Sequence, residues 1–373
     1  MLKETWSEQS LFIFRQVFTM GERISANNSS IGACFQRLNM SIPDKGITSP
    51  WFSTTFALIG LFSNLIAFCV LVNAYQKTHS RSRSSFLIFL CGLVVTDFMG
   101  LLVTASVVCS YHFTKFEWAE VDPKCHLCNF FGLSMVFYGL CPLLLGASMA
   151  VERFIGINKP FERSANMSKR RAFLTVLMVW IFAFCLGLLP IVGLGSYTLH
   201  YPKSFCFLSL SHDIMSIAFG MIFSLVGILS VVLSFVLNTI SIVTLCKVCF
   251  DRNSVQRRRD SEVEMMVQLV GIMLIASACW LPLLIFIAQT VLQAPPQGVP
   301  QDILPPETNK YLLIYIRVAT WNQILDPWVY ILFRRSVLRK MYPKLSSRPS
   351  IVSLYPEYSM SLRRKLTQES VIH

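Results

Sequence analysis

Two charged side chains of opposite sign lie in one strongly apolar stretch of the chain, Tyr311–Phe333. The stretch is long enough to cross a bilayer as a helix, because about 20 residues span about 30 Å of hydrocarbon. It contains Arg317 and Asp326, and ionisable groups inside a membrane span are costly and usually functional. Their spacing of nine residues places them on opposite faces of a helix, with about 13 Å of rise between them. Each charge therefore requires its own partner.

Arg317 is suited to bind an anion, because a guanidinium stays charged at this depth and its planar fork matches a carboxylate. An acidic residue of the chain itself is one candidate partner, and Asp97 is the main one. However, no Asp or Glu occurs in the outer half of any long apolar stretch, including the one where an amine ligand would need an acid. We therefore favour a ligand that joins a carboxylate to an apolar body, as a fatty-acid derivative does.

A second set of charges predicts a switch. Glu152 lies beside Arg153 at the end of another apolar stretch, where it can hold the arginine until its release opens a cleft for a partner protein. Asp97 and Asp326 can face one water-filled cavity, and two such carboxylates favour a shared proton or cation. A sodium ion can be held there, and no other cofactor is expected. Pro327 interrupts helical hydrogen bonding and predicts a hinge.

Seven long apolar runs must position these groups. The 373-residue chain is 54% hydrophobic and only 14% charged, which is typical of a polytopic membrane protein. The runs are Trp51–Tyr75, Phe86–Tyr111, Cys128–Asn158, Ala172–Leu194, Ile214–Val248, Val263–Leu292 and Tyr311–Phe333.

These runs predict an all-α membrane fold, a seven-transmembrane helix bundle over residues 51–333. A tail of residues 1–50 precedes the bundle. A short amphipathic helix follows on the cytoplasmic membrane surface over 334–345. A disordered, serine-rich tail with candidate phosphorylation sites is expected over 346–373.

The distribution of Lys and Arg predicts the orientation of the chain. With the N-terminus outside, nearly all basic loop residues fall on the cytoplasmic side, as the positive-inside rule requires. The net charge of +13 then faces anionic lipid headgroups, and no nucleic-acid partner is expected. We expect a plasma-membrane protein with an extracellular N-terminal tail glycosylated at Asn28 and Asn39, which begin Asn-x-Ser sequons. The sequon at Asn166 falls on the predicted inner side and is interpreted as a chance match.

Four of the 12 cysteines fall on the predicted outer side, at Cys34, Cys125, Cys128 and Cys206. An even number in an oxidising compartment favours two disulfides. Cys125 and Cys128 are too close to pair comfortably with each other, which leaves two ways of joining the four. We favour Cys128–Cys206 with Cys34–Cys125. The Cys-x-x-Cys spacing also resembles a metal motif, but we expect no metal there.

Several functional classes lack their signatures in this chain. No run holds the mid-membrane lysine of a retinal pigment, no repeat symmetry indicates a transporter, and no ring of like charges indicates an ion pore. Neither GxSxG nor HExxH is present, so no enzymatic activity is expected. The polar residues within the runs fit instead a helical bundle with a binding pocket at its outer end and a conformational switch at its inner end.

A series of motifs, one after another along the runs, resembles the rhodopsin-like G-protein-coupled receptors. The motifs are Asn64, Leu93-x-x-x-Asp97, Glu152-Arg153-Phe154, Trp180, Cys279-Trp280-Leu281-Pro282 and Asp326-Pro327-x-x-Tyr330. Asp326 stands where most of that class has Asn, and together with the segments Arg317–Trp328 and Tyr201–Phe207 it is similar to the prostanoid receptors. The similarity covers the chain from about Ser49 to Leu345.

The resemblance implies a set of ligand-binding residues. The carboxylate would meet Arg317, His112 and either Ser204 or Ser209, and the apolar body would be lined by Met135, Phe207, Leu313, Ile316 and Trp280. Met135, Leu313 and Ile316 are equally compatible with ordinary core packing, and His112 with a plain role at the membrane interface. In the outer loop Phe205 replaces the Trp of the family, which removes an N–H donor and some stacking area and bears on ligand preference.

The resemblance also implies partners. They are a prostanoid ligand, heterotrimeric G proteins of the Gq and G12/13 classes, which raise calcium and activate Rho, and arrestin. The switch that the G protein reads would comprise Asp97, Glu152, Arg153, Asp326, Pro327 and Tyr330. Two alternatives stay open: a receptor for another lipid acid, and an organic-anion transporter that uses Arg317 as its substrate site.

Overall fold

The computed structural model describes residues 34–35, 50–78, 80–158, 168–250, 256–293 and 306–332. The predicted glycosylation sites, the amphipathic helix over 334–345 and the tail over 346–373 lie outside these ranges. The chain divides into two units, Met1–Tyr330 and Ile331–His373. All the helices and both strands lie in the first unit, except for the last two residues of α9.

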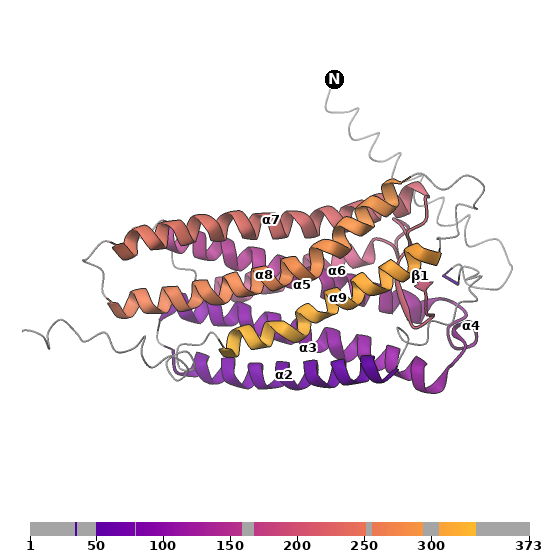
Figure 1. Cartoon of the computed structure of the whole chain (residues 1–373), viewed down its shortest axis with the longest axis horizontal. Helices are drawn as coiled ribbons and strands as arrows, with labels where there is room; N and C mark the ends of the chain where they lie inside the picture. Colours follow the sequence, from indigo (N-terminus) through magenta and orange to yellow (C-terminus); the bar gives the residue numbers. More distant parts are fainter. Residues whose placement is uncertain are drawn as a thin grey trace, which may run out of the picture. The chain divides into compact units, whose positions relative to one another are not determined.

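Seven long helices lie in the described ranges (Figure 1). They are α2 (Pro50–Gln76), α3 (Arg81–Thr114), α5 (His126–Asn158), α6 (Lys169–Leu188), α7 (Ile214–Phe250), α8 (Gln256–Leu292) and α9 (Pro306–Leu332). Each contains or overlaps one predicted run, and a short helix, α4 (Trp118–Val121), lies between α3 and α5. The contacts place α2 beside α3, α7 beside α8, and α5 against α3, α6 and α7.

The largest errors in the predicted boundaries are at the start of α8, which begins at Gln256 instead of Val263, and at the end of α6. The helix ends at Leu188 instead of Leu194, because Pro190 begins a turn in which Gly193 and Gly195 have φ values of +102° and +91°. Only glycine enters that conformation readily. Two further helices begin five residues earlier than predicted: α3 is capped by Ser80, whose hydroxyl accepts from Arg83 N, and α9 begins at Pro306, a residue suited to a first helical turn.

Six of these helices are long and apolar enough to cross a membrane, judged over the described residues, and α9 is not among the six. Its 27 residues give a length of about 40 Å, which is sufficient. The helix fails on composition, because it carries Arg317, Asp326 and several amides. The same polar residues that lower its hydropathy are the candidate functional groups.

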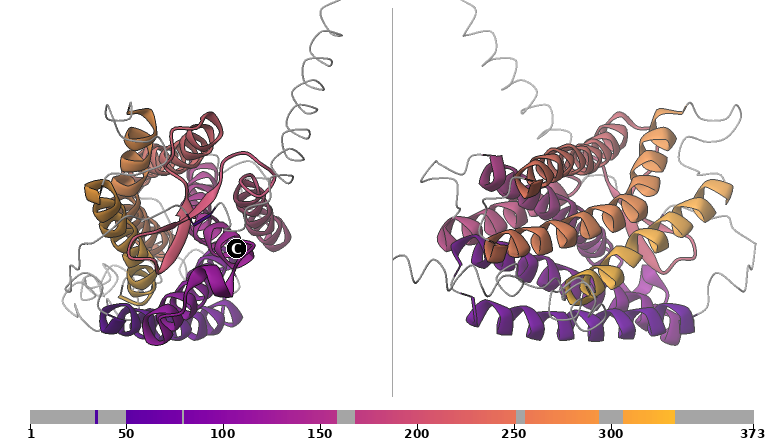
Figure 2. Two further views of the ribbon diagram at one scale, coloured as in Figure 1. Left: turned by 90° about the vertical axis from the view of Figure 1, so that its right-hand side faces the viewer. Right: turned by 60° about the vertical axis from the view of Figure 1, so that its left-hand side comes forward.

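A two-stranded antiparallel hairpin lies across the ends of the helices (Figure 2). Strand β1 (Tyr197–His200) pairs with β2 (Phe205–Leu208), and all eight residues are buried. The structure contains the disulfides Cys128–Cys206 and Cys34–Cys125, which are the favoured pairing. The first joins β2 to α5. The second brings Cys34 to the hairpin, where its carbonyl oxygen accepts from Leu199 N at 3.0 Å.

Candidate ligand-binding site

A cavity of about 150 Å³ lies between the helices and the hairpin. Nine of the ten predicted ligand-binding residues line it: His112, Met135, Ser204, Phe205, Phe207, Trp280, Leu313, Ile316 and Arg317. They come from α3, α5, α8, α9 and the hairpin region, so that side chains more than 200 positions apart in sequence meet here. The remaining one, Ser209, does not line the cavity.

Ser209 is occupied elsewhere in the loop after β2. Its hydroxyl donates to Ser211 Oγ at 3.1 Å, and its backbone N–H donates to the Ser196 carbonyl at 2.8 Å. Of the two serines that the resemblance offers, Ser204 is therefore the one at the cavity. The reason is local: Ser204 directly precedes β2, whereas Ser209 closes the base of the hairpin beyond its last pair, Tyr197 with Leu208.

One end of the cavity is electropositive. Arg317 is half-buried, and His112, which is 6% exposed, lies close enough for their charges to interact, as does Lys115. The Nδ1 atom of His112 is buried with no hydrogen-bond partner among the described residues. A buried, unpartnered polar atom is costly, and beside Arg317 it adds to an environment that favours an anionic, hydrogen-bonding group.

The rest of the cavity is mostly apolar. Trp280 packs against Gly139, where an added Cβ would lie 2.7 Å from the indole Cη2 atom. Gly139 thus lets α5 and α8 approach closely. Phe207 packs edge-on against Phe223, with ring centroids 5.8 Å apart. A long hydrocarbon chain matches such a lining by the hydrophobic effect alone.

Sequence reasoning missed several lining residues. The prediction did not include Tyr138, Thr320 or Gln323, nor any residue of α2, although Phe56 lines the cavity and stacks edge-on against Trp321 at 4.7 Å. Helical periodicity could have found part of this set. Eight residues of α9 line the cavity, and five of them follow the spacing of a single helix face: Leu313, Ile316, Arg317, Thr320 and Ile324.

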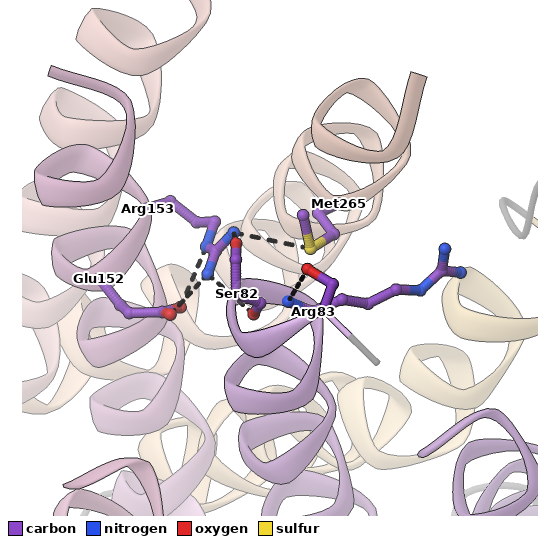
Figure 3. Close-up of polar contacts among 6 residues, drawn as sticks. Ser82, Arg83, Glu152, Arg153 and Met265 are labelled. Carbon is purple, nitrogen blue, oxygen red and sulfur yellow. Dashed lines mark hydrogen bonds and ion pairs between the residues drawn. The ribbon is translucent and has the colours of Figure 1, made fainter. Parts of the chain in front are cut away.

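At the other end of the long helices, Glu152 and Arg153 form the predicted ion pair. Arg153 Nε donates to Glu152 Oε2 at 3.0 Å, and both side chains are 3% exposed. Figure 3 shows the guanidinium reaching two further helices: it donates to Ser82 Oγ of α3 at 2.9 Å and contacts Met265 Sδ of α8 at 3.6 Å. Arg153 therefore joins three helices at one point.

Asp97 and Asp326 are both completely buried. Asn322 Nδ2 donates to one oxygen of Asp326 at 3.0 Å, and Asn64 Nδ2 donates to the Gln323 carbonyl at 2.8 Å. Both carboxylate oxygens of Asp97, the second oxygen of Asp326 and the amide oxygens of Asn64 and Asn322 have no partner among the described residues. Such a group of acceptors requires a source of positive charge or protons. Pro327 and Tyr330 follow on α9, and the Tyr330 side chain is not described.

Comparison with known proteins agrees with this arrangement. Residues 10–330 match the family model of the seven-transmembrane receptors of the rhodopsin family. The crystal structure of squid rhodopsin superposes with a TM-score of 0.66 at 19% identity, over 86% of this chain and 92% of that one, which shows the fold. That fold makes α9 the seventh span.

Curated relatives are much more similar in sequence. The thromboxane A2 receptor of Bos taurus is 57% identical over 93% of this chain and 99% of its own length. That of Homo sapiens is 58% identical over 89% and 97%. The prostaglandin F2-alpha receptor of Homo sapiens is 37% identical over 80% and 82%. Proteins of this family are receptors and not enzymes, and they are multi-pass proteins of the plasma membrane. The chain belongs to the rhodopsin family of seven-transmembrane receptors and, within it, to the prostanoid receptors.

Proposed function

We propose that this chain is a receptor for thromboxane or a closely related carboxylate-bearing lipid. The observation that carries the proposal is the cavity itself, apolar along most of its wall and bearing Arg317 and His112 together at one end. The relatives named for thromboxane A2 support the ligand class, as does the segment Asp260–Met266, which resembles the thromboxane receptors in particular.

Replacement of Arg317 tests the proposal. Arg317→Gln should weaken binding of a carboxylate thromboxane mimetic by about 30-fold to several thousand-fold, because truncating one partner of a buried charge pair costs about 2–5 kcal/mol. The methyl ester of the same compound should bind both receptors alike. Arg317→Lys is the matched control: it keeps the charge but loses the planar fork, and should give an intermediate affinity for the acid. Equal losses for acid and ester would contradict the assignment.

A ligand panel separates thromboxane from other prostanoids. In competition binding, a thromboxane mimetic should displace a radiolabelled carboxylate ligand more effectively than prostaglandins E, D or F. Equal or better displacement by one of the prostaglandins would assign the receptor to another prostanoid. Flux of a labelled prostanoid through proteoliposomes, without agonist-stimulated GTP exchange, would favour the anion-transporter alternative.

The same proposal includes the signalling partners. Ligand binding biases a bistable helix bundle, and a G protein binds the face where Arg153 is released from Glu152. We assign the Gq and G12/13 classes, with arrestin as a further partner, from the resemblance to the family. An agonist should raise calcium and activate Rho in cells expressing the chain. Cells that lack the α subunits of both classes should lose both responses, and persistence of the responses there would refute the assignment.

We further propose that Asp97 and Asp326 hold a sodium ion with the amide oxygens of Asn64 and Asn322. All four are oxygen donors, which suit a hard cation, and all have unpartnered oxygen atoms. The ion would supply positive charge between the two carboxylates. Titration of agonist affinity with NaCl against N-methylglucamine chloride at constant ionic strength tests this: sodium should lower agonist affinity in the wild type and have no effect in Asp97→Asn.

A further inference from the structure

The turn of the hairpin over the cavity is held from outside the hairpin by a tryptophan. Trp118, in the short helix α4, lies at the same end of the bundle as β1 (Figure 1). Its indole Nε1–H donates to the carbonyl oxygen of Lys203 at 2.7 Å, across 85 positions of sequence. The next residue, Ser204, is 4% exposed and lines the cavity. The hydrogen bond therefore ends one peptide unit from the cavity wall.

The backbone at Lys203 needs such a restraint. Its φ of +67° lies in the left-handed region, which is unfavourable for a residue with a Cβ atom. The Lys203 N–H donates to the His200 carbonyl at 2.7 Å within the hairpin, and the Lys203 carbonyl accepts from Trp118. Because a peptide unit is planar, fixing the Lys203 oxygen also fixes the amide nitrogen of Ser204, and with it the direction in which the chain enters β2.

Trp118 is itself held by two long helices. Its side chain is 3% exposed and packs against Phe116 with ring centroids 5.2 Å apart, and Phe116 packs against Tyr111 of α3 at 5.6 Å. The Asp122 N–H donates to the Trp118 carbonyl at 2.8 Å, and the Asp122 carboxylate accepts from the N–H of Cys128 in α5 at 2.8 Å. The indole is therefore connected to both α3 and α5 and provides a fixed reference for the turn.

Two residues of the cavity wall follow this turn directly. Phe205 opens β2 in register with His200, and the two rings stack with centroids 5.8 Å apart and planes inclined by 18°. The imidazole is fixed in turn, because its Nε2 atom lies 3.0 Å from the Leu208 carbonyl oxygen. Phe205 is thus located by contacts within the hairpin itself, and Ser204 by the peptide that Trp118 holds.

We propose that Trp118 is a positioning residue for ligand binding: its indole N–H sets the Lys203–Ser204 peptide so that the Ser204 hydroxyl meets the ligand carboxylate. The inference rests on the proposed function, in which Arg317, His112 and Ser204 bind that carboxylate. Trp118 is not among the residues that line the cavity, and it acts only through Ser204. Loss of its hydrogen bond lets the strained turn relax and lowers affinity, and this loss disappears when Ser204 has no hydroxyl.

The test is a double-mutant cycle on the full chain in membranes, measured as the Kd of a radiolabelled carboxylate thromboxane mimetic. Trp118→Phe keeps an aromatic ring and removes the donor, and it should raise the Kd about 2- to 12-fold, the effect of one net hydrogen bond. The number of binding sites should stay near the wild-type value, since a folding defect would lower it. In the Ser204→Ala background the same change should alter the Kd by no more than about 2-fold, because Trp118 acts through Ser204.

Trp51→Phe is the matched control, since Trp51 is 71% exposed on α2 and is not among the lining residues; its Kd should equal that of the wild type. An unchanged Kd in Trp118→Phe overturns the proposal. An equal loss of affinity with and without the Ser204 hydroxyl also overturns it, because the role of Trp118 would then be purely structural. If Trp118→Phe yields no receptor in the membrane, 3-benzothienylalanine at position 118, introduced by stop-codon suppression, decides the question: it keeps the two-ring shape and replaces the N–H by sulfur.

Failure of the ligand assignment would be visible separately. It would appear in the wild type, as equal binding of the carboxylate mimetic and its methyl ester. Failure of the positioning role would appear only in the comparison of Trp118→Phe with the wild type, whose preference for the acid would be intact.

Discussion

Arg317 and Asp326 share one helix but have different surroundings. Arg317 lies at the cavity with His112 beside it, whereas Asp326 is fully buried among amides and close to Asp97. Nine residues of helix separate them, and this spacing predicted the division between ligand site and switch. Sequence could not show which outer-loop serine would reach the cavity, because Ser204 and Ser209 differ only in where the hairpin places them.

Neutralising Glu152 should raise basal activity. Arg153 would lose its ion pair with Glu152, and a charge-assisted hydrogen bond contributes about 1.5–3 kcal/mol, enough to shift a two-state equilibrium by tenfold or more. We expect Glu152→Gln to increase ligand-independent GTP exchange. Glu120→Gln, an exposed carboxylate of α4, should leave basal exchange unchanged. A basal rate at the wild-type level in Glu152→Gln would show that this pair does not restrain the inactive state.

Burial of His200 predicts a loss of stability in acid. Burial lowers the pKa of His200 from 6.5 to about 4, although hydrogen bonds to Leu208, Asn309 and Phe207 act in the opposite direction. Between these two pKa values the unfolded chain binds a proton that the folded chain does not, so stability falls as the pH falls. The loss from pH 7 to pH 5 should be about 2 kcal/mol. Thermal unfolding of purified receptor at the two pH values measures it, and His200→Gln should reduce the difference. An equal pH effect in that variant would assign it to other groups.

At the scale of elements, helices were predictable and the hairpin was not. Long apolar runs located all seven long helices of the described residues, and some of their boundaries failed where short-range signals act, such as Pro190 with Gly193 after α6. The strands lack the alternation that marks a half-exposed strand, because every residue of β1 and β2 is buried. The stacking of His200 on Phe205 depends on that pairing and was therefore invisible in the sequence.

The close approach of α5 and α8 at Gly139 makes this position sensitive. A Cβ there would lie 2.7 Å from Trp280, and overpacking of this kind typically costs about 1–3 kcal/mol. We expect Gly139→Ala to lower the unfolding temperature and weaken ligand binding by displacing the indole. Gly146→Ala is the matched control on the same helix, since a Cβ there meets nothing within 4 Å. Equal stability of the two variants would refute this account of the α5–α8 contact.

The disulfide between β2 and α5 should be required for binding. Cys206→Ser would free the strand that carries Phe205 and Phe207, and loss of a native disulfide commonly costs about 2–5 kcal/mol. Binding of a carboxylate ligand should fall strongly, whereas Cys185→Ser, a free and exposed cysteine of α6, should bind as the wild type does. Retained affinity in Cys206→Ser would mean that the hairpin closes the cavity without this bond.

For the molecule as a whole, orientation in the membrane stays a prediction. The bias of Lys and Arg favours an outer N-terminus, as does the placement of both disulfides at the same end of the bundle as the hairpin. An N-terminal epitope should be accessible to antibody on intact cells, and a C-terminal epitope only after permeabilisation. Glycosidase treatment should reduce the apparent mass through Asn28 and Asn39. The reverse pattern of accessibility would invert the topology.

The two disulfides also have a practical consequence for assays. Both disulfides, Cys34–Cys125 and Cys128–Cys206, lie at the hairpin of β1 and β2. A thiol reductant in the buffer would therefore disturb the hairpin over the cavity, while leaving Arg317 and His112 chemically intact. Poor binding after reduction would therefore reflect the loss of these disulfides and not a defect at Arg317. The Arg317 variants should be compared on material whose disulfides have been verified by mass spectrometry.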